Sequence, residues 1–356
     1  MGLPSIDITF KTTAASAITR GERGIVALIL KDAVENGFKE IQLVSEIPVT
    51  LSTVNKKFIS LALIGGIKPP KKVVMYILPL AAANYSAAQT YLETVKWDYL
   101  AVPEIADGDR ANMVTWIKGL RDTLEKKVKL VIDGVAGDHE GIITFTTVTL
   151  SVGETVNTTK DYAPRIAGLL AGTPLTVSAT FQILPEITDV SPRLTKSQLN
   201  TAIDAGKFEI YNDGEKCKVA RAVNSLVTTT ADKGATFKKI KVVDILDLIY
   251  TDIKRTAEDN YIGKYANSYD NKVLLITAIN GYFAQLITDG LLDSKAVNQC
   301  TIDLVAQRNY LVSIGTNVEN LTEQQIKEYN TNDKVFLAAT IKPLDAIEDI
   351  SIGIKI

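Results

Sequence analysis

The last seven residues of the chain alternate strictly between apolar and other side chains. Isoleucine occupies every second position from Ile350 to Ile356, with Ser351, Gly353 and Lys355 between. Successive side chains of a β-strand point to opposite faces, so the four isoleucines form one apolar stripe. Burying each isoleucine contributes roughly 1.5–3 kcal/mol, and burying the whole stripe contributes about 6–12 kcal/mol as an upper bound. The pattern therefore predicts a β-strand whose apolar face must be covered.

The sequence leaves two partners for this strand open. It is an edge strand that completes a sheet of its own domain, or it is donated to another subunit. We expect no hairpin partner, because the sequence ends at Ile356. In the second case, main-chain hydrogen bonds supply affinity and alternate side chains supply specificity.

The other end of the chain shows a similar pattern. Leu3–Phe10 alternates, and Pro4 suits the start or the edge of a strand because proline donates no ladder hydrogen bond. Small residues follow over 12–17, and glycines at 21 and 24 indicate a hinge. We therefore expect a strand-like arm at each terminus. The residues predicted to contact other subunits through these arms are Ile6, Ile8, Phe10, Ile350, Ile352, Ile354 and Ile356.

Composition is that of an ordinary globular protein. Of the 356 residues, 46% are hydrophobic and 22% are charged, and the net charge of −2 argues against a dominant role in binding nucleic acid or anionic membranes. Cys217 and Cys300 fit a reducing compartment and are expected to be buried free thiols. Neither a signal peptide nor an apolar run long enough to span a bilayer is visible. We expect synthesis and use in the cytoplasm, or exit by a route other than secretion.

Buried strands alternate with helices from residue 24 to about 191. The continuous apolar run Ile25–Leu30 is typical of a strand covered on both faces, and Lys72–Leu78 is predicted to be the next buried strand. Asp109–Leu124 has a helical apolar stripe. Such alternation implies crossover connections and a mainly parallel sheet. We predict a doubly wound, mainly parallel α/β domain in this half of the chain.

The second half is predicted to be a C-terminal α+β domain. Thr195–Gln198 has capping-box spacing, a hairpin follows over 208–223, and two long helices cover about 240–257 and 271–288. Residues 304–314 and 335–341 are predicted to be strands of a final small sheet. The predicted organisation is an N-terminal strand arm at 1–23, the α/β domain at 24–191, the α+β domain at 192–342, and a C-terminal strand arm at 343–356.

An ordered series of features spans much of this second half. A helix leads to Gly206, a strand, the turn Asn212–Gly214 and a strand bearing Arg221, and the series continues through 239–244, 252–256, 261–264 and the helix after Asp270. This series, about a third of the chain, resembles the tail sheath proteins of contractile phages and phage-tail-like (R-type) bacteriocins. The chain departs from that pattern where Asn224–Leu226 intervenes before a Thr-Thr pair, and it is short, as in a minimal sheath.

The resemblance implies a structural role in a contractile injection system. Subunits would stack as hexameric rings in a helical lattice around an inner tube protein, with the C-terminal domain facing the tube and an α/β domain of subtilisin-like topology. Terminal arms would exchange strands with neighbours while contraction drives the tube through a target envelope. Baseplate and tail terminator proteins would be further partners. Assembly would occur in the bacterial cytoplasm, with release by lysis as part of a virion tail or a tail-like particle; the sequence does not distinguish these two.

Catalytic and ligand-binding patterns are weak. His139, the sole histidine, lies in a polar loop near Asp133, so a triad with a distant serine is conceivable, but an exposed loop histidine is the commoner case. No phosphate-binding glycine pattern occurs, and the spacing of histidine and cysteines provides no metal site. We expect no enzyme activity, cofactor or metal. The alternative is a cytoplasmic doubly wound α/β enzyme or a protein that binds nucleotides or sugars.

Basic residues cluster around the first of the two long helices. They form either a solvated surface or an electrostatic contact with an acidic tube surface. Such a contact would fix the alignment of the subunit on the tube more than it would raise the affinity between them. The candidate tube contacts are Lys238, Lys239, Lys241, Lys254 and Arg255.

Overall fold

A computed structural model describes residues 17–356, which form two compact units. The α/β unit contains Glu22–Asp247 and Asp345–Ile356, and the helical unit contains Leu248–Leu344 together with the described residues up to Gly21. The chain therefore passes between the units after Gly21, after Asp247 and after Leu344. The predicted boundary after residue 191 differs from this division, because residues 192–247 pack with the α/β unit.

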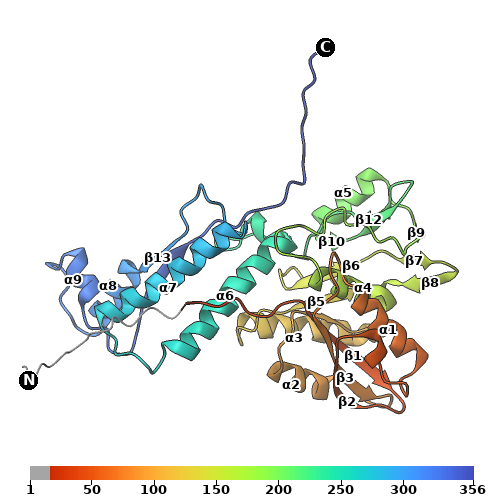
Figure 1. Ribbon diagram of the computed structural model, residues 1–356, viewed down its shortest axis with the longest axis horizontal. Coiled ribbons are helices and arrows are strands. Elements are labelled where there is room, and N and C mark those ends of the chain that lie inside the picture. Colours follow the sequence, from red (N-terminus) through yellow and green to blue (C-terminus); the bar gives the residue numbers. More distant parts are fainter. Residues whose placement is uncertain (1–16) are drawn as a thin grey trace, which may run out of the picture. The chain divides into compact units, whose positions relative to one another are not determined.

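A seven-stranded sheet forms the centre of the α/β unit, with the order β10-β6-β5-β4-β1-β3-β2 (Figure 1). Neighbouring strands are parallel except for β2, which is antiparallel to β3. The predicted mainly parallel sheet is thereby confirmed. Its strands are β1 (Ile25–Asp32), β2 (Gly37–Ile41), β3 (Lys72–Pro79), β4 (Tyr99–Ala101), β5 (Lys129–Asp133), β6 (Ile142–Phe145) and β10 (Lys207–Phe208).

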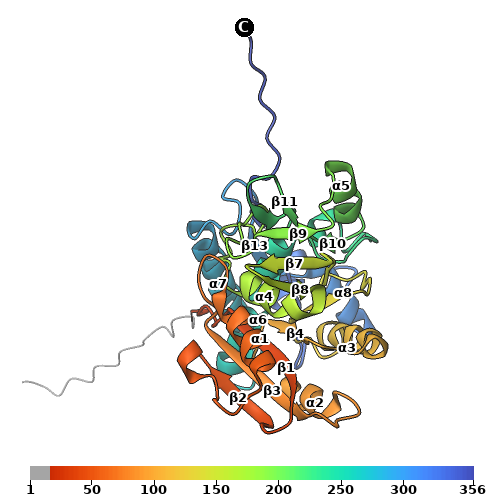
Figure 2. The same cartoon turned by 90° about the vertical axis from the view of Figure 1, so that its right-hand side faces the viewer.

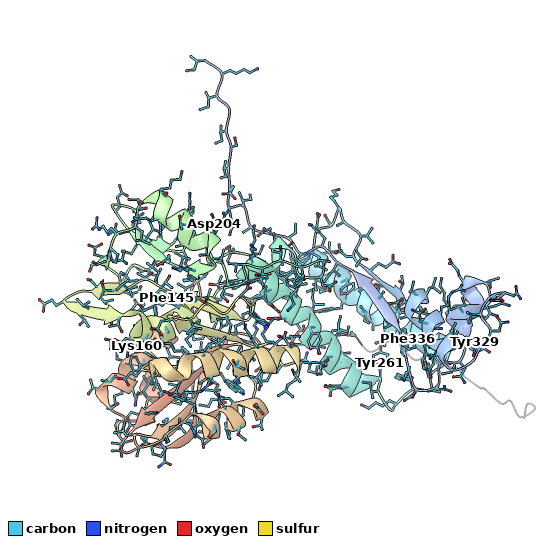
Figure 3. All side chains as sticks on the ribbon, turned by 180° about the vertical axis from the view of Figure 1, so that it is seen from behind. Phe145, Lys160, Asp204, Tyr261, Tyr329 and Phe336 are labelled. Carbon is cyan, nitrogen blue, oxygen red and sulfur yellow. The ribbon has the colours of Figure 1, made fainter. Side chains whose placement is uncertain are left out.

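Helices cover both faces of this sheet. In β1, Val26 and Leu28 belong to the core layer that contains α1 (Thr53–Ile64) and α4 (Thr159–Ala171). The alternate residue Ala27 belongs to the layer that contains α2 (Ser86–Thr94) and α3 (Arg110–Asp122). Both faces of the sheet are therefore shielded from solvent at β1, which explains the continuous apolar run of that strand. In Figure 3, Phe145 of β6 lies inside this unit, whereas Lys160 and Asp204 lie at its periphery.

Close packing of α1 against α4 requires a glycine. A Cβ atom added to Gly168 would lie 2.0 Å from the carbonyl oxygen of Ala62. No side chain fits at that distance, so any residue other than glycine would push the two helices apart. Gly168 thus fixes how tightly this helical layer lies on the sheet.

Two small antiparallel sheets and α5 complete the α/β unit. β7 (Thr149–Val152) pairs with β8 (Thr155–Thr158) and with β9 (Asp189–Ser191). β11 (Ile210–Asn212) and β12 (Cys217–Val219) form the predicted hairpin. The predicted capping box of α5 (Lys196–Asp204) is also confirmed, because the Thr195 side chain accepts from the main-chain N–H of Gln198.

The helical unit contains two long helices, two short ones and a small sheet. α6 (Ile240–Asn260) begins in the α/β unit, and the other elements are α7 (Tyr269–Thr288), β13 (Gln299–Ile302), α8 (Leu304–Ser313), α9 (Glu323–Glu328) and β14 (Leu337–Thr340). β13 and β14 pair antiparallel. Single-turn 3₁₀ helices cover Val44–Glu46, Asp107–Asp109 and Ala235–Lys238. Tyr261, Tyr329 and Phe336 are labelled within the helical unit in Figure 3.

The prediction of a strand over 304–314 is wrong. The Asp303 carboxylate accepts from the Ala306 main-chain N–H and begins α8, and Leu311 is buried against Ile326 of α9. The apolar residues of this segment also have a helical spacing, but its β-branched residues, taken alone, favour a strand.

None of the helices in residues 17–356 combines the length and the apolar character that a membrane span requires.

Candidate assembly segments and polar clusters

The predicted C-terminal strand lies exposed. Ile350, Ile352 and Ile354 expose 75%, 77% and 83% of their surfaces. Among the described residues, the segment 350–356 pairs with no strand, and Figures 1 and 2 show it extending away from the α/β unit to which it belongs. It is therefore not an edge strand of a sheet in the part of the chain that the structure describes. Its contact with other subunits stays a prediction.

The segment just before this strand is tightly bound to the α/β unit. The Glu348 carboxylate accepts hydrogen bonds from the Ser178 hydroxyl at 3.0 Å, the Thr180 hydroxyl at 2.6 Å and Arg221 Nε at 3.1 Å. We call these four residues the Glu348 cluster. The Arg221 guanidinium also pairs with Asp349. The chain is thus fixed immediately before it becomes exposed.

The first described residues are bound to the helical unit. Arg20 Nη2 lies 2.9 Å from Asp289 Oδ2, and the Gly21 N–H donates to the buried carboxylate of Asp252 at 2.8 Å. The Arg255 guanidinium donates to the carbonyl oxygen of Thr19. The predicted arm contacts Ile6, Ile8 and Phe10 lie outside the described residues.

The five basic candidate residues are divided between the two units. Lys238, Lys239 and Lys241 belong to the α/β unit, and the other two, 254 and 255, belong to the helical unit. Lys239 pairs with Asp345, and Lys241 is buried, so burial lowers the pKa of its ammonium group. Arg255 is engaged with the N-terminal segment described above. Tube contact by these five residues stays a prediction.

A buried ion network joins the first half of α6 to the sheet of the α/β unit. Asp244 accepts from the Tyr99 hydroxyl at 2.7 Å, lies 2.8 Å from Lys129 Nζ, and pairs with Arg23. Asp247 forms ion pairs with Lys129 and with the guanidinium of Arg121 on α3. Burial opposes ionisation of Asp247, but these cations outweigh it and lower the pKa of its carboxyl to about 2. Sequence reasoning missed this network because each of these pairings joins residues more than a hundred positions apart.

His139 is buried, contrary to the expected exposed loop histidine. Its Nδ1 accepts from the Gly141 main-chain N–H at 3.0 Å, and its Nε2 lies 3.1 Å from Asp122 Oδ2. An acceptor Nδ1 places the proton on Nε2, which donates to Asp122. Burial also lowers the pKa of the imidazole, so the neutral form dominates. The loop carrying His139 is held by α3, a contact that the sequence pattern did not reveal.

The same geometry tests metal binding. Donor atoms of Asp122, His139 and Glu140 lie within 4.8 Å of one another. If Nε2 bound a metal ion, the imidazole proton would move to Nδ1. That N–H would then face the main-chain N–H of Gly141, and two hydrogen-bond donors would oppose each other. Glu140 is moreover occupied by Lys233 Nζ at 3.0 Å. The donor set does not fit a metal ion.

In the part of the chain that the structure describes, Asp133, His139 and a serine do not form a catalytic triad. Asp133 lies 2.6 Å from Arg110 Nη2 and not beside His139. Ser225 Oγ hydrogen-bonds the main-chain N–H and carbonyl oxygen of His139, not its ring. Cys217 and Cys300 are buried free thiols, as predicted, and burial raises the pKa of both.

A hollow of about 370 Å³ lies beyond the carboxyl ends of the parallel strands β6 and β10. Such ends are where open α/β sheets bind ligands. The buried carboxyl of Glu209 lines this hollow, accepts from Thr147 Oγ1 at 2.8 Å, and has its pKa raised by burial. Lys207 also lines the hollow, so the lining carries one acidic and one basic side chain, and the sequence provides no phosphate-binding glycine loop to favour a nucleotide there.

Comparisons with known proteins decide the family. Residues 80–225 match the phage tail sheath protein central domain, and residues 232–356 match the phage tail sheath C-terminal domain. The tail sheath protein of Clostridium phage phiCD119 is 36% identical over 359 residues, covering 99% of both chains. The chain belongs to the phage tail sheath family. The family resemblance seen in the sequence is confirmed.

Solved sheath structures share the fold of this sheath chain. The sheath tail protein from Desulfitobacterium hafniense has a TM-score of 0.75 at 20% identity, covering 97% of this chain and 98% of that one. The helical sheath of the anti-feeding prophage in its contracted state has a TM-score of 0.73 at 15% identity, covering 100% and 99%. The chain is therefore a structural sheath subunit of a phage tail or tail-like particle and not an enzyme.

Proposed function

We propose that the sheath subunit polymerises by exchanging terminal strands with its neighbours. Stacked hexameric rings surround an inner tube, and contraction of the linked rings drives the tube through a target envelope. The observation that carries the proposal is the isoleucine stripe, exposed from Ile350 onward although the segment before it is tightly bound. An exposed apolar stripe of this kind marks an interaction site.

One strand exchange contributes a limited free energy, so the lattice depends on many such exchanges. Covering the four isoleucines contributes at most about 6–12 kcal/mol before the cost of ordering the arm. Each subunit donates and receives arms, so a ring lattice adds these contacts multivalently. A mesh of this kind holds together while rigid units move.

The β13–β14 sheet is a suitable acceptor for an arm. Among residues 17–356 this sheet has two strands, and two-stranded sheets are marginally stable alone. Cys300 and Ile302 on β13 are buried, whereas Ala338 and Ala339 on β14 are exposed. A donated strand beside β14 would extend the sheet and satisfy its outer main-chain groups.

Further partners follow from the same assignment. The inner tube protein lies inside the rings, and baseplate and tail terminator proteins contact the ends of the sheath. Lys238, Lys239, Lys241, Lys254 and Arg255 are candidate tube contacts. Assembly takes place in the bacterial cytoplasm, and lysis releases the particle.

Deletion of residues 350–356 tests strand exchange. The truncated subunit should fold, with a circular dichroism spectrum and unfolding transition like those of the full chain, but should form no tubes or rings under negative-stain microscopy. The matched variants are Ile352→Asp with Ile354→Asp on the apolar face and Ser351→Ala with Lys355→Ala on the other face. The first pair should prevent polymerisation and the second pair should not. Tubes formed by the truncated chain would disprove strand exchange.

A further inference from the structure

Glu348 is a buried carboxylate with a full set of donors. Its side chain is 7% exposed, and Lys239 Nζ lies 3.6 Å away as a second cation. Oε1 accepts from the Ser178 and Thr180 hydroxyls, and Oε2 accepts from Arg221 Nε. Charge-assisted hydrogen bonds of this kind are stronger than neutral ones. The buried charge is therefore held in one position.

The surrounding groups are themselves oriented. Thr180 Oγ1 accepts from the Ala222 main-chain N–H at 3.0 Å, so its own proton is directed to Glu348. The neighbouring residue Asp349 is 86% exposed and makes only a surface pair with Arg221. Position 348 thus differs from position 349 in burial and in the number of donors, although both are acidic and adjacent.

The two chain ends are bound to different units. All partners of Glu348 belong to the α/β unit, whereas Arg20 and Gly21 are bound to Asp289 and Asp252 of the helical unit. Asp345 begins the part of the chain that returns to the α/β unit, and Lys239 of that unit pairs with it. Any tension between the two arms of one subunit must therefore cross from one unit to the other.

We propose that Glu348 is the positioning residue of the C-terminal arm: through Ser178, Thr180 and Arg221 it fixes where the isoleucine strand leaves the α/β unit. This inference rests on the strand exchange proposed above. A fixed exit point removes conformational freedom before the arm is received, which lowers the entropic cost of exchange. The arm then transmits force to the α/β unit and not to the helical unit.

The test compares two substitutions that each remove one negative charge. In Glu348→Gln the amide N–H₂ must face either the two hydroxyl donors or the guanidinium, so one side of the site is left with two donors facing each other. The protein concentration needed for polymerisation, measured by sedimentation, should therefore rise about tenfold. Asp349→Asn, on the exposed neighbour, should change that concentration less than about threefold. Deletion of residues 350–356 is run beside them.

A distance measurement reports the exit point without polymerisation. Spin labels at Ser351→Cys and at the exposed Thr115→Cys of α3 are placed in the Ile352→Asp, Ile354→Asp chain. The distance distribution should be narrow with Glu348 and at least about twofold broader with Glu348→Gln, as expected when an anchored segment is released. Ser178→Ala should broaden it in the same direction, which keeps the test valid if Glu348→Gln does not fold.

The outcomes separate the two proposals. If truncation abolishes polymerisation while Glu348→Gln polymerises like the unaltered chain with an unchanged distance distribution, the positioning role is overturned and strand exchange stands. If the truncated chain polymerises normally, strand exchange is overturned and the positioning role falls with it. A large effect of Glu348→Gln beside a small effect of Asp349→Asn supports the role.

Discussion

The Arg121 guanidinium on α3 donates two hydrogen bonds to the Asp247 carboxylate on α6, Nη1 to Oδ2 and Nη2 to Oδ1, both at 2.9 Å. Both side chains are largely buried, with exposed fractions of 3% and 12%. Lys129 adds a second cation to the same carboxylate. Removing the Asp247 charge leaves Arg121 and Lys129 charged inside the protein with fewer anionic partners, namely Glu140 and Asp244.

We therefore expect Asp247→Asn to destabilise the α/β unit by about 3–5 kcal/mol. The measurement is urea unfolding of the chain lacking residues 350–356, which removes the contribution of assembly. The exposed Asp232→Asn in the same unit is the control and should change the unfolding free energy by less than about 0.5 kcal/mol. Equal effects of the two substitutions would contradict a buried network.

The same network predicts acid lability. The pKa of Asp247 is lowered from 3.8 to about 2, so its contribution is present above about pH 4 and is lost as the pH falls toward 2. The loss amounts to about 2 kcal/mol. Asp138 has its pKa lowered to about 2, chiefly by the Thr228 hydroxyl, and acts in the same direction. Asp98, whose pKa burial raises, acts in the opposite direction.

Unfolding free energies at pH 7, 4, 3 and 2 measure this dependence. Asp247→Asn should flatten the decline between pH 4 and 2, because the asparagine does not titrate. A truncated chain as stable at pH 2 as at pH 7 would be inconsistent with ionised buried carboxylates.

Two glycines in helices of the α/β unit should respond in opposite directions to alanine. Gly168→Ala places a Cβ 2.0 Å from the Ala62 carbonyl oxygen and should destabilise by about 1–3 kcal/mol through overpacking. A Cβ on Gly119 of α3 meets nothing within 4 Å, so Gly119→Ala should stabilise by about 0.5–1 kcal/mol. Thermal unfolding of both variants measures these changes in stability. If Gly168→Ala left the stability unchanged, α1 and α4 could separate without cost.

The acceptor of the arm can be mapped directly. A photoreactive benzoylphenylalanine at Ile352 should cross-link one subunit to the next, giving a ladder of oligomers on a denaturing gel. Mass spectrometry should place the cross-link on β14. The same amino acid at Thr115 of α3 should give no cross-link to β14. Cross-links only within single chains would show that the arm folds back onto its own subunit.

Local patterns sufficed for much of the fold. The apolar run Ile25–Leu30 predicted a strand covered on both faces, and Thr195 with Gln198 predicted the start of α5, because main-chain periodicity and capping depend on residues close in sequence. The isoleucine alternation predicted an apolar stripe but left open whether the chain's own sheet covers it, and the structure leaves this stripe exposed. By contrast, 304–314 became a helix, since the capping of α8 and its packing against α9 outweighed strand propensity.

By itself, the sequence determined the strand and helix periodicities, the parallel sheet and the alternating ends, all of which arise from neighbouring residues. Only the tertiary structure decided that His139 is buried against Asp122, that Asp247 joins Arg121 and Lys129, and that Glu348 is bound to residues more than a hundred positions away. The physical reason is that a buried polar or charged group is stable only where hydrogen-bond or ionic partners surround it. Those partners come from distant segments, which folding alone brings together.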